Sequence, residues 1–303
     1  MNLSAILGPG PLTGLGFANN LAKYKGGAGT PVNYDAGNKL IAALHQFDHH
    51  DEAYLLTSLE TGEITWSQGI LKWLGYPDVV PGMPLPPDYL SQHIPVSVRT
   101  WYQVFINAAI LAMKEEKVEY LATRFVINIP LRRPNGQVTL VKQMMMPFHF
   151  DSKKRIVSLI HSFTLFGDHR EGDPLQPGVF HREEKKDHIY EKIIQKVAGA
   201  CRPIFPKENL TRAHFEQLDV LAELRKTPTE INLDSMVAAL EEGKSEKRAR
   251  DSVRSSLDVM KRKLLSLVGE DNNDKVALDV IQFFQRSGFT DVLRVIWEKE
   301  TGG

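Results

Sequence analysis

Three consecutive β-rich runs between residues 120 and 166 place the strongest constraint on how this chain can fold. The first gap between them holds Pro134-Asn135-Gly136, and the second holds Asp151-Ser152-Lys153. Asn-Gly between β-rich segments is a strong hairpin signal. Strands joined by connections this short run antiparallel. The segment therefore predicts a three-stranded antiparallel meander.

The residues before this meander predict the rest of one layered fold. Residues 51–69 read as strand, turn and strand, residues 70–78 as a short helix, and residues 95–118 as a longer amphipathic helix. The order predicts an α+β fold with one antiparallel sheet of about five strands and helices on one face. The expected core comprises Leu56, Ile64, Trp66, Leu74, Phe105, Phe125, Val141 and Leu159.

Composition changes along the chain divide it into four parts. Residues 1–47 begin as a Gly-, Pro- and Asn-rich arm without a dinucleotide fingerprint and end in a short helix over 36–47. Residues 48–168 hold the expected sheet. Residues 169–206 read as a polar linker followed by a connecting helix, and residues 207–303 as an all-helical domain.

The overall composition excludes several classes of protein. The 303 residues suffice for about two domains. Lys plus Arg and Asp plus Glu both total 37, so bulk charge cannot hold the chain to nucleic acid or to a membrane. No apolar run is long enough to span a bilayer, and the N-terminus lacks the basic region of a signal peptide. We expect a cytoplasmic protein.

The residues that could carry catalysis or hold a metal lack a suitable setting. Cys201, the single cysteine, excludes a disulfide framework and has no nucleophile context. His149 and His161 alternate with apolar residues and read as half-buried sheet histidines rather than haem ligands. A tract near residue 48 reads as solvent-exposed rather than as a metal site; it contains His45, Asp48, His49, His50 and Asp51. We expect no catalytic site and no haem, flavin or metal cofactor.

Charge in the C-terminal part is strongly segregated. Residues 208–242 carry 8 acidic and 3 basic side chains, whereas residues 244–263 carry 8 basic and 3 acidic ones. The basic segment predicts one helix with a single buried stripe, formed by Ala249, Val253, Leu257, Met260 and Leu264. At about 100° per residue, we expect the basic side chains to point away from this stripe. Such a helix can contact DNA in the major groove, or it can be a solvated helix face.

The sheet region resembles a PAS domain. The opening strand pair is followed by ILKWLGY, which is similar to the family's helix ending in Leu-Gly-Tyr, and LRRPNGQVTLVKQ is similar to its basic hairpin. Residues 92–95 occupy the place of a His-Pro-Asp-Asp helix start but lack the acidic pair. The resemblance implies a sensory domain with an unknown small-molecule ligand. A flavin–cysteinyl photosensor is excluded because this region holds no cysteine.

The helical region resembles a LuxR-type helix-turn-helix. LTRAHFEQLDVLA is similar to the family's opening helix, with Glu216 and Leu218 at matching positions, and SVRSSLDVMKRKL is similar to its recognition helix. The intervening segment is longer than in the family and lacks its Lys-Glu-Ile-Ala, so a divergent or a winged form stays open. The DNA-contacting residues implied on the basic helix are Lys247, Arg250, Arg254, Ser255 and Lys261.

Together these features predict a transcriptional regulator in which a PAS-like sensor controls binding to double-stranded DNA. An apolar stripe of Ile189, Ile193 and Val197 on the connecting helix suits a two-helix seam and predicts a homodimer. The alternative is a signalling module whose helical half binds another protein instead of DNA.

Overall fold

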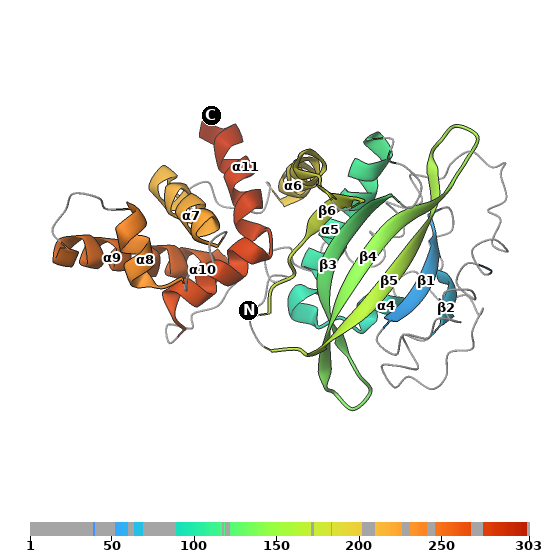
Figure 1. The fold of residues 1–303 in the computed structure, drawn as a ribbon, viewed down its shortest axis with the longest axis horizontal. Coiled ribbons are helices and arrows are strands. Elements are labelled where there is room, and N and C mark those ends of the chain that lie inside the picture. Colours follow the sequence, from blue (N-terminus) through green and yellow to red (C-terminus); the bar gives the residue numbers. More distant parts are fainter. Residues whose placement is uncertain are drawn as a thin grey trace.

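The fold was analysed in a computed structural model. It describes residues 39, 52–59, 64–68, 89–116, 118, 122–170, 173–182, 184–201, 210–225, 231–240, 246–267 and 275–301. The arm and helix expected over residues 1–47 lie outside this set apart from Lys39, as does the helix expected over 70–78. The described residues form a half containing a sheet and a helical half beside it (Figure 1).

One antiparallel sheet forms the first half, with strands in the order β2-β1-β5-β4-β3-β6-β7. The strands are β1 (Glu52–Ser58), β2 (Ile64–Gln68), β3 (Thr123–Arg132), β4 (Val138–Phe150), β5 (Ile156–Asp168), β6 (Gly178–His181) and β7 (Glu184–Lys185). The five expected strands and the α+β class are confirmed, and two short strands extend one edge.

The β3–β4 hairpin forms at the predicted Asn-Gly turn. Arg132 pairs with Val138 at the last position of the ladder, and Gly136 takes a φ of +85°, which glycine adopts without steric cost. The side chain of Asn135 accepts a hydrogen bond from the Gln137 N–H at 3.0 Å. Local turn chemistry therefore fixes the register of β3 against β4.

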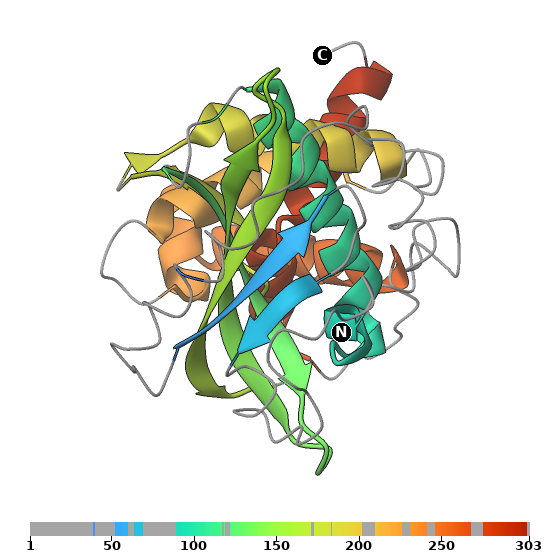
Figure 2. The ribbon, with the colours of Figure 1, turned by 90° about the vertical axis from the view of Figure 1, so that its right-hand side faces the viewer.

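Helices α4 (Tyr89–Gln92) and α5 (Val96–Glu115) lie against one face of the sheet (Figures 1 and 2). Four predicted core residues are buried here: Phe105, Phe125, Val141 and Leu159. Leu56 is also buried but does not belong to this core cluster. Ile64 and Trp66 lie on β2, but their side chains are outside the described set, as is all of Leu74. The predicted core between sheet and helix is thus confirmed for four of the five predicted residues whose side chains the structure describes.

The segment expected as a polar linker over residues 169–184 contributes to the sheet instead. Strand β6 pairs with β3 from Thr123 to Val126. Just before it, the carbonyl oxygen of Leu175 accepts a hydrogen bond from the Asn128 N–H at 2.6 Å. This edge strand was not predicted from the sequence, because residues such as Pro174, Pro177 and Gly178 normally mark loops.

Helix α6 (Asp187–Cys201) packs between the two halves, against α5 and against the C-terminal helix α11 (Phe289–Thr301). Ile189, Ile193 and Val197 are buried within the chain. The apolar stripe therefore does not form an exposed seam for a second copy, and the reasoning that led from it to a dimer was wrong.

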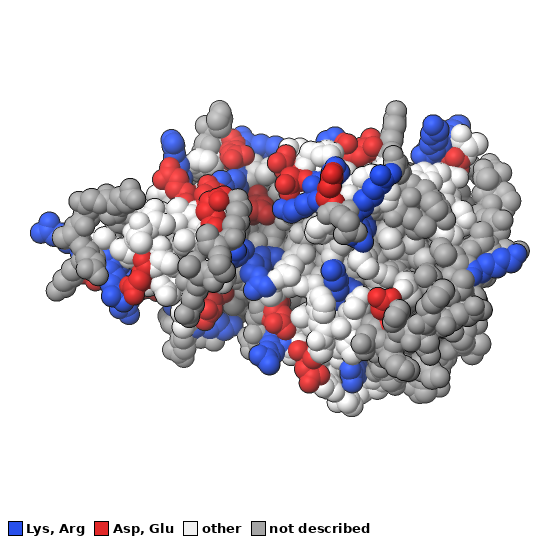
Figure 3. Space-filling model, viewed as in Figure 1, with Lys and Arg blue, Asp and Glu red and all other residues white. Residues whose placement is uncertain are grey.

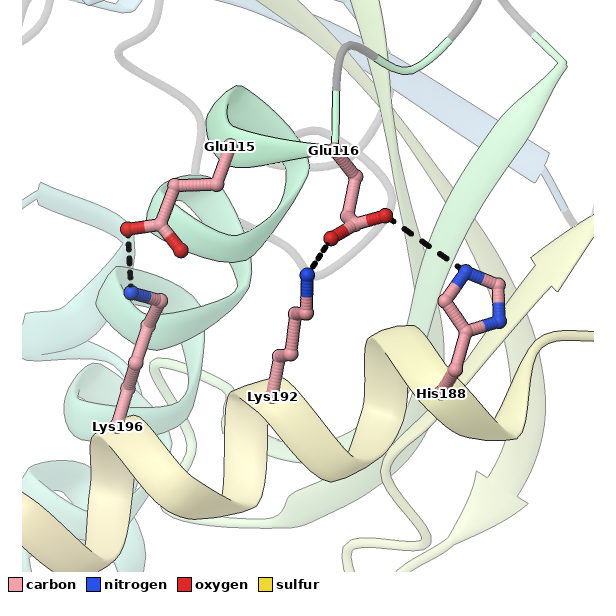
Figure 4. Close-up of polar contacts among 5 residues, drawn as sticks. All are labelled: Glu115, Glu116, His188, Lys192 and Lys196. Atoms are coloured by element: carbon pink, nitrogen blue, oxygen red, sulfur yellow. Dashed lines mark hydrogen bonds and ion pairs between the residues drawn. The ribbon is translucent and has the colours of Figure 1, made fainter.

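Exposed ion pairs connect α6 to the C-terminal end of α5 (Figure 4). Lys196 donates to Glu115 at 2.6 Å, and Lys192 donates to Glu116. The hydrogen bond from Lys192 holds the pKa of Glu116 below its ordinary value. Surface pairs of this kind add little stability, so the buried stripe accounts for most of the attachment of α6.

The remaining helices confirm the expected all-helical C-terminal part. They are α7 (Arg212–Leu224), α8 (Leu233–Leu240), α9 (Glu246–Leu267), α10 (Ala277–Arg286) and α11. Helix α9 packs against both α8 and α10. Among the described helices, none combines the length and the apolar character needed to cross a bilayer.

Candidate functional site

A cavity lies between the sheet and the helices that cover it. It holds about 580 Å³ of empty space, part of it open to solvent. Strands β1 and β5 and helices α4 and α5 supply its mainly apolar wall, with Leu55, Leu59, Leu90, Ile106, Ile110 and Leu159. Apolar cavities with a few convergent polar groups are the usual form of small-molecule sites. This cavity is therefore the candidate ligand site of the sheet half.

Three buried polar side chains form a relay at this cavity. The Tyr102 hydroxyl on α5 donates to Gln143 Oε1 on β4 at 2.8 Å, and Gln143 Nε2 lies 2.7 Å from Nδ1 of His161 on β5. Tyr102 and His161 line the cavity directly. Sequence analysis missed the relay because its members come from three elements with no recognisable spacing.

His161 is more deeply buried than the half-buried position that the sequence predicted, with 6% of its surface exposed. Burial lowers its pKa to about 3, so the ring is neutral at neutral pH. Its Nε2 is buried and has no hydrogen-bond partner among the described residues. His149 is only half-buried, and its Nδ1 lies 2.9 Å from Ser158 Oγ.

Helix α9 carries the second candidate site, a nucleic-acid interface. Its predicted inward stripe is confirmed, since Ala249, Val253, Leu257, Met260 and Leu264 are all buried. Ser255 lies opposite this stripe, Arg250 and Arg254 lie on its flank, and all three are exposed. Ser256 instead exchanges hydrogen bonds with Gln217 on α7, at 2.8 and 3.0 Å. Packing thus fixes which side of α9 faces out.

Arg250 is exposed but partly neutralised. Its Nη2 lies 3.1 Å from Asp234 Oδ1 on α8, and both side chains are more than half exposed. An exposed pair of this kind is weak, so the arginine can exchange the carboxylate for a phosphate. Lys247 also lies on α9, but its side chain is outside the described set.

Lys261 does not point away from the core, and that prediction was wrong. Only 8% of its surface is exposed, and its Nζ donates to the carbonyl oxygen of Lys275 at 3.2 Å. The reason lies in helix periodicity: Lys261 follows Leu257 by four positions and precedes Leu264 by three, which places it on the buried side. Its ammonium group joins α9 to the start of α10 rather than facing solvent.

On the face shown in Figure 3, the described basic and acidic side chains are interspersed and form no extended basic patch, in line with the zero net charge of the sequence. Among the described residues, no group of three or more His, Cys, Asp or Glu side chains is placed to hold a metal ion. The histidine-rich tract at residues 45–51 lies outside that set.

Comparison with known proteins gives likeness only among solved structures. No protein-family model and no curated protein matches the chain. A phage VqmA–DPO complex is 11% identical, with a TM-score of 0.30 over 84% of this chain and 91% of that chain. A Vibrio cholerae VqmA–ligand–DNA complex is 13% identical, with a TM-score of 0.29 over 82% and 88%. A V. cholerae VqmA dimer without target DNA is 14% identical, with a TM-score of 0.27 over 83% and 88%.

Proposed function

We propose that this chain is a transcriptional regulator in which the PAS-like half senses a small molecule and controls DNA binding by α9. The observation that carries the proposal is the two-sided character of α9, which is fixed by its apolar stripe on α8 and α10 and presents Arg250, Arg254 and Ser255 outward. At 22 residues the helix is about 33 Å long, ample for the major groove.

Each exposed side chain has a distinct proposed task. The guanidinium of Arg254 can donate two parallel hydrogen bonds to guanine O6 and N7. Arg250 can bind a phosphate once it leaves Asp234, and the Ser255 hydroxyl can reach a phosphate or a base edge. Lys247 belongs to the same helix and is proposed as a further phosphate contact. Lys261 is not part of the interface.

We further propose that the protein binds DNA as a homodimer. Helix-turn-helix proteins generally place two recognition helices in successive major grooves, one for each half-site. The solved VqmA structures include a complex with DPO, a complex with a ligand and DNA, and a dimer without target DNA. For this chain, a small-molecule ligand is proposed from its cavity, and DNA is proposed as a partner from the exposed side of α9. Light scattering that shows a monomer in the presence of a bound DNA site would contradict the dimer.

DNA binding is tested by selecting genomic fragments on the purified full chain and titrating them by fluorescence anisotropy at two salt concentrations. A DNA-binding helix loses affinity steeply as salt rises, because counterions are released from the phosphates. Arg254→Ala is expected to cost about 1–3 kcal/mol, mainly on the selected fragment. Arg250→Ala is expected to weaken the binding of all fragments and to reduce the salt dependence of that binding.

Arg212→Ala is the matched control, because Arg212 is an exposed arginine on α7 that pairs with Glu216, four positions further along the same helix. It should leave DNA affinity unchanged. If the double variant of Arg250 and Arg254 binds DNA like the unmodified chain while it stays folded, α9 is a solvated face. The alternative of a protein-interaction module would then replace the proposal.

A further inference from the structure

The cavity of the sheet half carries a hydrogen-bonding group whose direction the structure determines. Gln143 Oε1 faces the Tyr102 hydroxyl, and because a carbonyl oxygen only accepts, the hydroxyl is the donor in this pair. The other end of the amide is the NH₂ group, which lies 2.7 Å from Nδ1 of His161. An amide NH₂ cannot accept, so Nδ1 is the acceptor in this pair.

This arrangement selects one tautomer of the His161 ring. A neutral imidazole holds a single proton, and Nδ1 is occupied as an acceptor, so the proton resides on Nε2. The Nε2 atom is the one that is buried without a partner among the described residues. His161 lines the cavity and therefore carries a buried donor N–H on a ring that is oriented by a relay beginning on α5.

A buried donor without a partner destabilises the protein, and native structures rarely leave one unsatisfied. The surroundings also restrict what could satisfy it. Among the described residues the cavity wall contains no charged side chain, and its remaining polar groups are hydroxyls and the Gln103 amide. An ion would lose its hydration here without gaining a counter-charge. The partner of the N–H must be an uncharged acceptor.

We propose that the cavity binds a small, uncharged and mainly apolar molecule with one hydrogen-bond acceptor, such as a carbonyl oxygen or an aromatic ring nitrogen, and that His161 Nε2–H donates to it. His161 is thus the residue that determines specificity, and Gln143 and Tyr102 position it. The inference deepens the proposed sensory function but stands apart from DNA binding, because it concerns only the cavity.

Three probes of nearly equal size test the proposal on the full chain. Quinoline has a ring nitrogen that accepts, naphthalene has no acceptor, and N-methylquinolinium carries a charge. Binding is followed by NMR on protein labelled with ¹⁵N in the imidazole rings. We expect quinoline to bind about tenfold more tightly than naphthalene, with a shift of the His161 Nε2 signal, and N-methylquinolinium not to bind.

The variant His161→Phe keeps an aromatic ring but removes the donor, so the preference for quinoline over naphthalene should disappear. His149→Phe is the matched control, since His149 belongs to the same sheet and does not line the cavity; it should keep the preference. Should His161→Phe fail to fold, the ¹⁵N spectrum of the unmodified chain still decides, because it shows directly which ring nitrogen carries the proton.

Several results would overturn the inference: a proton on Nδ1, equal binding of quinoline and naphthalene, no binding of either probe, or an Nε2 signal that reports a bound water only. The same preparation is titrated with DNA. Loss of DNA binding with the quinoline preference intact would reject the proposed regulator and leave the cavity assignment standing. DNA binding without the quinoline preference would reject the cavity assignment and leave the proposed DNA-binding regulator standing.

Discussion

The indole N–H of Trp101 donates to the carbonyl oxygen of Ser287 at 3.2 Å, across 186 residues of sequence. Trp101 lies on α5, and Ser287 begins the turn between α10 and α11. The Trp101 ring also packs on Phe289, with ring centroids 5.1 Å apart. The next residue of α5, Tyr102, belongs to the cavity relay. One helix therefore contacts both the candidate ligand site and the helical half.

Gly288 in this turn is expected to tolerate no side chain. Its φ is +72°, and an added Cβ would lie 2.9 Å from Phe105 Cζ, 3.0 Å from the Tyr190 hydroxyl and 3.1 Å from Pro177 Cγ. Gly288→Ala should lower the free energy of unfolding by about 1–3 kcal/mol in urea titrations. Gly199→Ala on α6 is the control: its Cβ would meet nothing within 4 Å, and it should stabilise by about 0.5–1 kcal/mol. Equal effects of the two would contradict the described turn.

Stability should fall in acid partly through His161. Burial lowers its pKa to about 3 from 6.5, so between these values the unfolded chain binds a proton that the folded chain does not. Stability therefore decreases as the pH falls, by at most about 1.4 kcal/mol per pH unit from this group. His161→Phe should flatten the dependence below pH 6.5, measured by urea unfolding at several pH values.

His149→Phe provides the comparison for this pH dependence. Burial also lowers the pKa of His149, but this residue is only half-buried. Its replacement should flatten the acid dependence less than His161→Phe does. An acid profile that is unchanged in His161→Phe would show that the ring is protonated in the folded protein.

Lys261 and Arg254 should separate stability from DNA binding. Lys261→Met keeps the apolar stem but removes the hydrogen bond to Lys275, so it should cost about 1–3 kcal/mol of stability. Arg254→Ala removes an exposed side chain and should change stability by no more than about 0.5 kcal/mol. Under conditions where both are folded, only Arg254→Ala should weaken DNA binding. A Lys261→Met variant with unchanged stability would argue against its buried position.

The sheet half should not fold normally if the chain stops near residue 172. Such a fragment loses β6, which pairs with β3, and also loses α6. It would expose the otherwise buried surfaces of α5. A fragment that ends after Cys201 keeps both and should show a cooperative unfolding transition by circular dichroism. If the shorter fragment is equally stable, β6 and α6 are dispensable for the sheet half.

The features that were predictable from sequence are those set by neighbours along the chain. Asn135-Gly136 fixes its own hairpin, and the repeat from Ala249 to Leu264 defines the buried side of α9. The features that were missed depend on contacts between distant segments. Two apolar residues, Val179 and Phe180, make an edge strand only because β3 offers a free edge. Helix periodicity could have placed Lys261 beside the buried stripe. Its hydrogen-bond partner, the carbonyl oxygen of Lys275, could not be foreseen from the sequence.

The segment from Leu175 to Cys201 has a consequence for recombining this protein with others. The Gln176 N–H donates to the carbonyl oxygen of Arg286 on α10, and Tyr190 on α6 donates to Asp291 on α11, while β6 completes the sheet. A chimera joined within this segment would lose either the contacts of the segment with the sheet or its contacts with the helical half. To graft the helical half onto a foreign sensor, the donor fragment would have to include β6 and α6, and the foreign sheet would have to offer an open edge like that of β3.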